Sequence, residues 1–374
     1  MKVAFHADQP WFTTPGGIGT YVEQLAPALT ASDPSLELVP FRSTFPIDRA
    51  VAWFVPLGGV ILPWGIRTLY PSWDLLARPA LPASLADAVI VQATNPAAVP
   101  PVRLGQRLVA TVHDLAFDRY PELFPRAWRW LYRAGLRAIV RRADAVLVPS
   151  AYTAADLIAR TRVDGSRVHV TPLASSLPSS ANDPASRLER MGLAVPYILS
   201  VGTIEPRKNL VRLVRAYRQV APDVPHALVL AGPPGWGTRE LDSELARPGP
   251  GTIVRTGRVD DPDLDALYRG ADVFAYPSLY EGFGLPVVEA MTRAVPVVTS
   301  NTSSLPEVAG DAALLIDPTD VSELAEALAR VLADRTLSDE LRRRGRDRAA
   351  GFTWAATARA TLDVYRQLTG GTTS

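Results

Sequence analysis

The stretch YPSLYEGFGLPVVEA, residues 276–290, has the pattern of a strand end, a glycine loop and a new helix. A short apolar run over residues 272–277 leads into it. Gly282 and Gly284 then indicate a tight loop, and Pro286 suits the first turn of a helix. Strand, loop and helix in this order are the repeating unit of doubly wound α/β sheets, so the stretch predicts that fold class.

The loop also has the properties of an anion site. Backbone N–H groups at a helix start, approached closely because glycine has no side chain, favour a phosphate through hydrogen bonds and the helix dipole. Glu281 lies in the loop, and Glu289 lies eight positions later in the first turns of the helix. A carboxylate accepts from two hydroxyls at once, so Glu289 suits a ribose and Glu281 a second polyol. The pattern predicts a sugar-nucleotide site; the alternative is that each carboxylate only stabilises a helix start, by roughly 0.3–1 kcal/mol.

The spacing of the two glutamates resembles the E-x(7)-E signature of family 4 of the retaining glycosyltransferases. The resemblance continues in SNTSSLPEV, residues 300–308, and extends over nearly the whole chain. It implies the GT-B fold, in which two Rossmann-like domains face a cleft and the last helix crosses back to the N-terminal domain. It also implies that the donor nucleotide sugar is bound by both glutamates and by the loop residues Gly282, Phe283, Gly284 and Leu285.

Length and composition exclude several classes of protein. A chain of 374 residues suits two domains, and 47% apolar residues with a mean hydropathy of +0.07 allow large cores. The longest apolar candidate, residues 51–62, is too short for a membrane span, and residues 1–6 are expected to form a strand rather than a signal peptide. Without cysteine there are no disulfides or thiolate zinc sites, and the four histidines lack ligand spacing. A net charge of +1 argues against a nucleic-acid partner.

The N-terminal half begins with an expected strand at residues 3–7, a glycine loop at 15–19 and a helix at 20–30. The loop lacks the G-x-G-x-x-G spacing of a dinucleotide site. By resemblance, Gly16 and Gly17 approach the donor diphosphate; the alternative is an ordinary tight turn.

His113 follows an expected strand at residues 107–112, at the strand end where ligands collect in open α/β sheets. The resemblance gives it the task of orienting the donor sugar or the acceptor. The alternative is a hydrogen-bonded histidine with a structural role only.

Two further segments of this half are open to two interpretations each. Residues 42–85 are expected to be irregular, proline-rich and aromatic, and to form either an acceptor-binding flap or an aromatic cover for the core. A helix at residues 125–142 carries arginines at steps of three and four, from Arg126 to Arg141, on one face. That face could contact anionic lipid or a lipid-linked acceptor, or simply be solvated.

The second half alternates strands and helices, as a doubly wound parallel sheet does. We expect an N-terminal Rossmann-like domain over residues 1–180, a nucleotide-sugar-binding domain over 181–353 and a final helix over 354–374. The D-x-D pattern within residues 261–265 opens an expected helix, where acidic residues serve as caps, so no metal site is predicted.

Arg207 and Lys208 follow the expected strand at residues 197–201. Of the 39 basic residues only Lys2 and Lys208 are lysine, so a lysine at a strand end before a helix start needs a reason. A planar guanidinium beside a compact ammonium is a common arrangement around a diphosphate. By resemblance, the pair neutralises the departing donor diphosphate.

The resemblance therefore implies a retaining glycosyltransferase that moves a hexose from a nucleotide diphosphate sugar to a hydroxyl, and we expect it to need neither a metal ion nor a cofactor. A GDP-mannose donor is a first guess from likeness to bacterial mannosyltransferases. The acceptor is a glycan, a lipid-linked molecule or a small molecule, and the expected location is the cytoplasm or the inner face of its membrane. The alternatives are a sugar-nucleotide epimerase or hydrolase of the same fold, and a non-catalytic nucleotide-sugar binder. The residues expected to carry the chemistry are Arg207, Lys208, Glu281 and His113.

Overall fold

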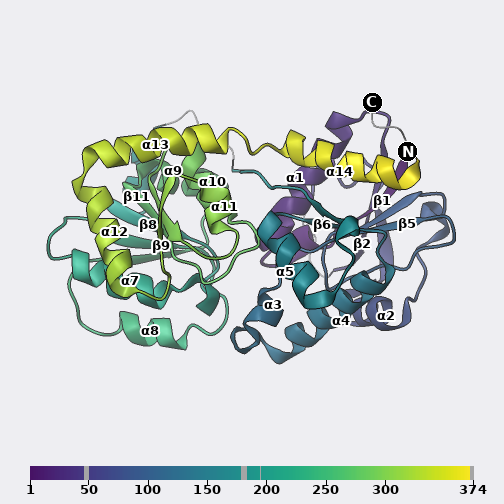
Figure 1. Ribbon diagram of the computed structural model, residues 1–374, viewed down its shortest axis with the longest axis horizontal. Coiled ribbons are helices and arrows are strands. Elements are labelled where there is room, and N and C mark those ends of the chain that lie inside the picture. The colour runs from purple at the N-terminus through teal and green to yellow at the C-terminus, as the bar shows by residue number, and fades with distance from the viewer. Residues whose placement is uncertain (46–49, 178–182, 194, 371–374) are drawn as a thin grey trace. The chain divides into compact units, whose positions relative to one another are not determined.

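The computed structural model describes all residues except 46–49, 178–182, 194 and 371–374 (Figure 1). Two compact units divide the chain. Unit 1 contains Met1–Leu173 together with the C-terminal segment from Thr353, and unit 2 contains Ala174–Phe352. Part of the connection expected to be a linker, residues 178–182, lies outside the described residues. No helix in the described part of the chain is long and apolar enough to span a membrane.

Unit 1 is built on a seven-stranded sheet in which all neighbouring strands are parallel. In spatial order the strands are β3 (Val60–Gly65), β2 (Glu37–Thr44), β1 (Lys2–His6), β4 (Ile90–Ala93), β5 (Arg107–Thr111), β6 (Ala145–Val148) and β7 (Val168–Val170). Its helices are α1 (Gly16–Ser32), α2 (Ile66–Leu76), α3 (Ala116–Arg119), α4 (Arg126–Arg142), α5 (Ala151–Thr161) and α14 (Trp354–Thr369).

Both faces of this sheet are covered, because successive residues of its central strands are all buried. In β1, Ala4 joins the core cluster that contains residues of α2, α4 and α5, whereas its neighbours Val3 and Phe5 are buried outside that cluster. Burial on both faces is typical of parallel sheets in α/β proteins. Helix α14 packs against α1 (Figure 1). The hydroxyl of Tyr365 in α14 also donates a hydrogen bond to the side chain of Gln92 in β4.

Residues 42–85, apart from 46–49, which lie outside the described residues, are not irregular throughout, and that prediction is wrong. They contain β3 and α2, although each includes a proline, Pro63 in β3 and Pro71 in α2. A proline is tolerated in β3 because this strand lies at the edge of the sheet. Tyr70 and Trp73 of α2 are buried in the core cluster, which favours the interpretation that these aromatics cover the core.

Unit 2 is built on a six-stranded parallel sheet. In spatial order its strands are β10 (Ile253–Gly257), β9 (Ala227–Ala231), β8 (Tyr197–Val201), β11 (Val273–Tyr276), β12 (Val297–Ser300) and β13 (Ala313–Ile316). Its helices are α6 (Ala185–Arg190), α7 (Leu210–Val220), α8 (Arg239–Leu245), α9 (Asp261–Gly270), α10 (Leu285–Thr292), α11 (Leu305–Ala309), α12 (Val321–Ala333) and α13 (Arg335–Ala349). Helices α7 and α12 pack together over one core cluster, while α10 packs against α13 and α6 against α9 (Figure 1).

The predicted α/β class with two doubly wound parallel sheets is confirmed. In unit 2 the strand order changes direction between β8 and β11, because the chain first adds strands on one side of β8 and then on the other. Open α/β sheets bind their ligands at such a point, outside the carboxyl ends of the strands. The loops after β8 and β11 are therefore where a site is expected.

Candidate functional site

A cluster of charged side chains lies where the loops after β8 and β11 meet. Arg207 and Lys208 belong to the first loop and Glu281 to the second, 74 and 73 positions away. Arg207 Nη1 donates to Glu281 Oε2 at 2.7 Å, and Lys208 Nζ donates to Glu281 Oε1 at 2.7 Å. The structure thus brings together three of the four residues expected to carry the chemistry.

Two further side chains complete the cluster. Arg207 Nη2 donates to Glu205 Oε1 at 2.6 Å. The Tyr276 hydroxyl accepts from Lys208 Nζ at 2.6 Å and donates to Glu281 Oε1 at 2.9 Å. The side chains of Arg207, Lys208 and Glu281 are only 13%, 11% and 9% exposed, so they are matched mainly by one another rather than by water.

Burial and charge act in opposite directions on these groups. Burial raises the pKa of Glu281, but the charges of Arg207 and Lys208 outweigh it and hold this pKa at about 2. Burial lowers the pKa of Lys208, and the neighbouring charge of Arg207 lowers it further. The arrangement of two cations with two carboxylates is close to neutral in total charge, so an arriving anion must compete with Glu205 and Glu281 for the cations.

Backbone contacts hold the two loops in register with each other. Arg207 Nη1 also donates to the Tyr280 carbonyl at 2.8 Å, and the Leu279 amide donates to the Arg207 carbonyl at 2.9 Å. The Asn209 side chain donates to the carbonyl of Pro277 at 3.0 Å. These bonds fix where the cationic pair lies relative to the loop that carries Glu281.

The start of α10 is built as the sequence indicated. Gly284 precedes the helix with a φ of +105°, a conformation that side chains other than glycine rarely adopt. A Cβ atom at this position would lie 2.7 Å from Leu305 Cδ2, so the loop also needs the space that glycine leaves. The Ser304 hydroxyl closes the loop by donating to the carbonyls of Glu281 and Phe283, at 3.0 Å and 2.9 Å.

Glu289 has partners of its own. Its Oε2 accepts from the Tyr268 hydroxyl at 2.9 Å, and its carbonyl accepts from Arg293 Nη1 at 3.1 Å. Burial raises the pKa of Glu289, although Tyr268 and Arg293 act against that shift. The two glutamates are therefore in different environments: Glu281 is held ionised between two cations, while Glu289 is hydrogen-bonded to a phenol.

His113, the fourth residue expected to carry the chemistry, lies in unit 1 just after β5. Its Nε2 donates to the Thr94 carbonyl at 2.9 Å, which sets the proton on that nitrogen because a carbonyl only accepts. Its ring meets that of Tyr21 edge to face, with 4.8 Å between centroids. Burial lowers the pKa of His113 to about 4, so the ring is neutral at physiological pH.

Gly16 and Gly17 do not lie in a loop before the helix; the helix expected at residues 20–30 begins at Gly16. The Gly19 amide donates to the Pro15 carbonyl at 3.1 Å, which closes the first turn. A Cβ atom at Gly19 would lie 2.3 Å from the Pro15 side chain, so this early start requires glycine there.

The acidic pattern at residues 261–265 is engaged in caps and ion pairs. Asp260 caps α9 by accepting from the Asp263 amide at 2.9 Å. Asp263 pairs with Arg187 at 2.6 Å, and Asp265 pairs with Arg293 at 2.7 Å. Within the described ranges, no three His, Cys, Asp or Glu side chains are grouped closely enough to hold a metal ion.

Sequence reasoning missed Glu205, Tyr276 and Tyr268. Glu205 stands two positions before Arg207, and Tyr276 ends the strand that leads into the glycine loop. The available signal was physical: cations at the buried end of a strand require partners, and the nearest polar residues in the same loops were candidates.

Comparison with known proteins shows the family to which the chain belongs. The family model for glycosyl transferases group 1 matches residues 192–348, and the model for glycosyltransferase family 4 matches residues 15–174. The chain belongs to glycosyltransferase family 4. It is 36% identical to the O-antigen chain mannosyltransferase B of Escherichia coli over 70% of this chain and 71% of that protein. It is 31% identical to the MMP alpha-(1->4)-mannosyltransferase of Mycolicibacterium hassiacum over 93% and 88% of the two chains.

Solved structures of low sequence identity share its fold. Sucrose-phosphate synthase of Thermosynechococcus elongatus aligns with a TM-score of 0.75 at 23% identity, over 99% of both chains. HepE of Anabaena in complex with UDP-glucose aligns with a TM-score of 0.73 at 17% identity, over 99% of this chain and all of that one. The glycosyltransferase therefore has the predicted GT-B fold.

The low pKa of His113 predicts a specific pH dependence of stability. An unfolded chain protonates this histidine near pH 6.5, whereas the folded one resists until about pH 4. Its contribution to stability is therefore lost as pH falls from about 6.5 to about 4. We expect an NMR titration midpoint near 4 for the ring, and urea unfolding should show a smaller loss between these pH values for His113→Gln. A midpoint near 6.5 would contradict the prediction.

Proposed function

We propose that this glycosyltransferase moves mannose from GDP-mannose to an acceptor hydroxyl with retention of the anomeric configuration. The observation that carries the proposal is the pairing of Arg207 and Lys208 with Glu281 at the switch point of the unit 2 sheet. The names of the similar proteins, which include mannosyltransferases of O-antigen chains, support mannose as the sugar and polysaccharide synthesis as the setting.

In this proposal the ion pairs of the ligand-free cluster are exchanged when donor binds. Glu281 occupies both cations at 2.7 Å, as the oxygens of a diphosphate would. A diphosphate carries more charge than one carboxylate, and the guanidinium fork suits two of its oxygens. The exchange releases Glu281 to accept hydrogen bonds from the donor sugar, while Arg207 and Lys208 stabilise the charge that develops on the departing diphosphate.

The transfer step follows from this arrangement. The bond between the sugar C1 and the diphosphate oxygen breaks, the acceptor oxygen bonds to C1 on the same face, and the departing phosphate takes the acceptor proton. The loop from Gly282 to Leu285 would bind the phosphates, and Glu289 would bind the ribose. For unit 1 we propose Gly16 and Gly17 as diphosphate contacts and His113 as a contact of the sugar or acceptor.

The two glutamates should respond differently to substitution. Glu289→Ala removes hydrogen bonds of a charged group, roughly 1.5–3 kcal/mol, so it should weaken GDP and GDP-mannose alike by about ten- to a hundred-fold. Glu281→Gln should not weaken GDP, because it removes a competitor for the cations, but it should weaken GDP-mannose and lower turnover further. Calorimetry with both ligands measures this.

Glu326→Ala, at an exposed position of α12, is the control for loss of a carboxylate. Equal loss of GDP affinity in the two variants would show that the roles are divided wrongly. No binding of GDP or UDP, free or sugar-bearing, to the parent protein would overturn the proposed function.

Activity should be independent of divalent metal, because Arg207 and Lys208 supply the positive charge that a cation would otherwise bring to the diphosphate. Transfer of labelled mannose should be unchanged in EDTA. Complete loss of transfer in EDTA, restored by Mg²⁺ or Mn²⁺, would contradict this expectation.

We further propose that α4 contacts the inner face of the membrane, which would place the enzyme in the cytoplasm with peripheral lipid contact. Arg129 and Arg133 are engaged within unit 1, with the Pro121 carbonyl and Asp118. The remaining arginines at these steps, together with an aromatic ring that is 52% exposed, form one exposed face of the helix: Arg126, Trp130, Arg137 and Arg141.

Each basic residue near an anionic membrane contributes about 1 kcal/mol, so Arg137→Glu/Arg141→Glu should reduce binding to phosphatidylserine vesicles by at least tenfold. Arg330→Glu/Arg335→Glu, which changes exposed arginines of unit 2 by the same charge, should bind as the parent does. Vesicle sedimentation decides, and absent binding of the parent, or equal binding of both variants, would refute the membrane contact.

A further inference from the structure

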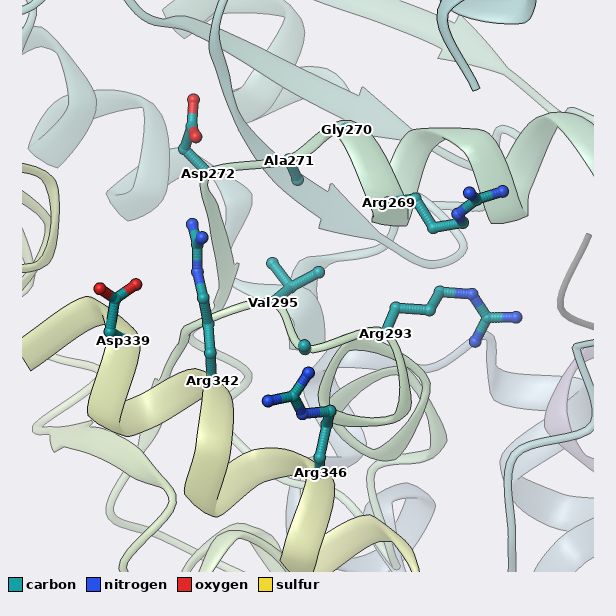
Figure 2. Close-up of a pocket in the computed structure, with 10 residues that line it drawn as sticks. Arg269, Gly270, Ala271, Asp272, Arg293, Val295, Asp339, Arg342 and Arg346 are labelled. Carbon is teal, nitrogen blue, oxygen red and sulfur yellow. The ribbon is translucent and has the colours of Figure 1, made fainter. Parts of the chain in front are cut away.

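A polar pocket of unit 2 lies at the opposite end of the sheet from the cluster of Arg207, Lys208 and Glu281. Asp272 immediately precedes β11 and Val295 lies just before β12, so the pocket borders the amino ends of these strands. Its volume is about 520 Å³. Figure 2 shows α13 forming one wall and the end of α9 another. The charged residues that line it are Arg269, Asp272, Arg293, Asp339, Arg342 and Arg346.

The four guanidinium groups of this pocket fall into two pairs. Arg269 and Arg293 share the buried carboxylate of Asp265, at 3.6 Å and 2.7 Å. Arg342 and Arg346 stand four positions apart, on one face of α13, and Figure 2 shows both extending from that helix toward the pocket. Their charge is thus presented to the pocket from the wall opposite α9.

The Arg342 and Arg346 side chains form no ion pair or hydrogen bond with the described residues, whereas Arg269 and Arg293 are paired with Asp265. Guanidinium groups that border a polar pocket without a carboxylate partner are available to an anion. The acceptor that matches a guanidinium fork best is a phosphate or a carboxylate, which takes two parallel hydrogen bonds.

Size and charge narrow the ligand class. When Asp265, the partner of Arg269 and Arg293, is counted with Asp272 and Asp339, the four arginines leave an excess of one positive charge, which favours an anion such as a phosphate monoester. A volume of about 520 Å³ exceeds the needs of a bare phosphate and lies in the usual range for small-molecule sites. The carboxylates of Asp272 and Asp339 remain as acceptors for hydroxyl groups. We propose that this pocket binds the phosphate monoester of a small polyol.

The pocket is connected to the donor-binding residue Glu289. Arg269 directly follows Tyr268, whose hydroxyl donates to the Glu289 carboxylate. Arg293 donates to the Glu289 carbonyl at 3.1 Å. Arg293 is only 2% exposed and its three nitrogens already donate to Asp265, Glu289 and Leu177, so a pocket ligand would act on Glu289 through Arg269 and its neighbour Tyr268. This connection to donor binding rests on the proposed function.

Calorimetry with glycerol 3-phosphate and inorganic phosphate tests the proposal on the full chain, without nucleotide. Arg342→Gln/Arg346→Gln keeps the apolar stems of both side chains and should weaken binding of both compounds by about tenfold or more, because two charge-assisted contacts are lost. Glycerol, which lacks the charge, should not bind. Arg239→Gln/Arg330→Gln makes the same change in net charge at exposed positions outside the pocket and should bind as the parent does.

The charged cluster is a competing anion site, so Lys208→Ala is measured in parallel. Binding that is lost in the α13 variant and kept in Lys208→Ala supports the pocket. Binding that is kept in the α13 variant and lost in Lys208→Ala would place the anion at the cluster and overturn the proposal. No binding to the parent, or equal weakening in the Arg239/Arg330 control, would also overturn it. Matching thermal midpoints of the variants exclude a folding defect as the cause.

Discussion

A buried carboxylate held between two cations is the interaction on which the unit 2 site depends. Glu281 is bound at 2.7 Å by both Arg207 and Lys208, whose side chains are only 13% and 11% exposed to water. Breaking one such buried pair leaves an uncompensated charge and costs about 3–5 kcal/mol. Because the partners come from the loops after β8 and β11, the same contacts that neutralise the charges also join the two central strands at their carboxyl ends.

In the proposed function, this pairing explains how the two cations assigned to the diphosphate can lie buried at a strand end. Two cations left alone at a buried strand end would repel each other and lose their hydration. Glu205 and Glu281 compensate them, and the Tyr276 hydroxyl links Lys208 to Glu281. In the proposal, a donor must therefore displace the Glu281 carboxylate from the cations. The displaced carboxylate then lies next to the donor sugar that it is proposed to bind, so its release and the binding of the sugar are one event.

Secondary structure followed from the sequence where local and global preferences agree. The strand at residues 197–201 has the expected bounds, and the apolar run at residues 272–277 contains β11, because strands buried on both faces read as unbroken apolar runs. The prediction failed in residues 42–85, where prolines in β3 and α2 indicated loop. Burial of Tyr70 and Trp73 in the unit 1 core outweighs those local preferences. The free energy gained by this burial depends on core residues that are distant in sequence. The early start of α1 at Gly16 depends instead on a local contact, the close approach of Pro15 and Gly19.

The sequence by itself determined which residues stand at strand ends: Arg207 and Lys208 after β8, Glu281 and the glycine loop after β11, His113 after β5. It did so because strands and their terminating loops are local patterns. Only the tertiary structure decided the partners of these residues. Glu281 meets Arg207 across 74 positions and Glu289 meets Tyr268 across 21, since the order and register of parallel strands bring their loops together. Charge state follows the same division: residue type sets the ordinary pKa, and burial and neighbouring charges move Glu281 to about 2 and His113 to about 4.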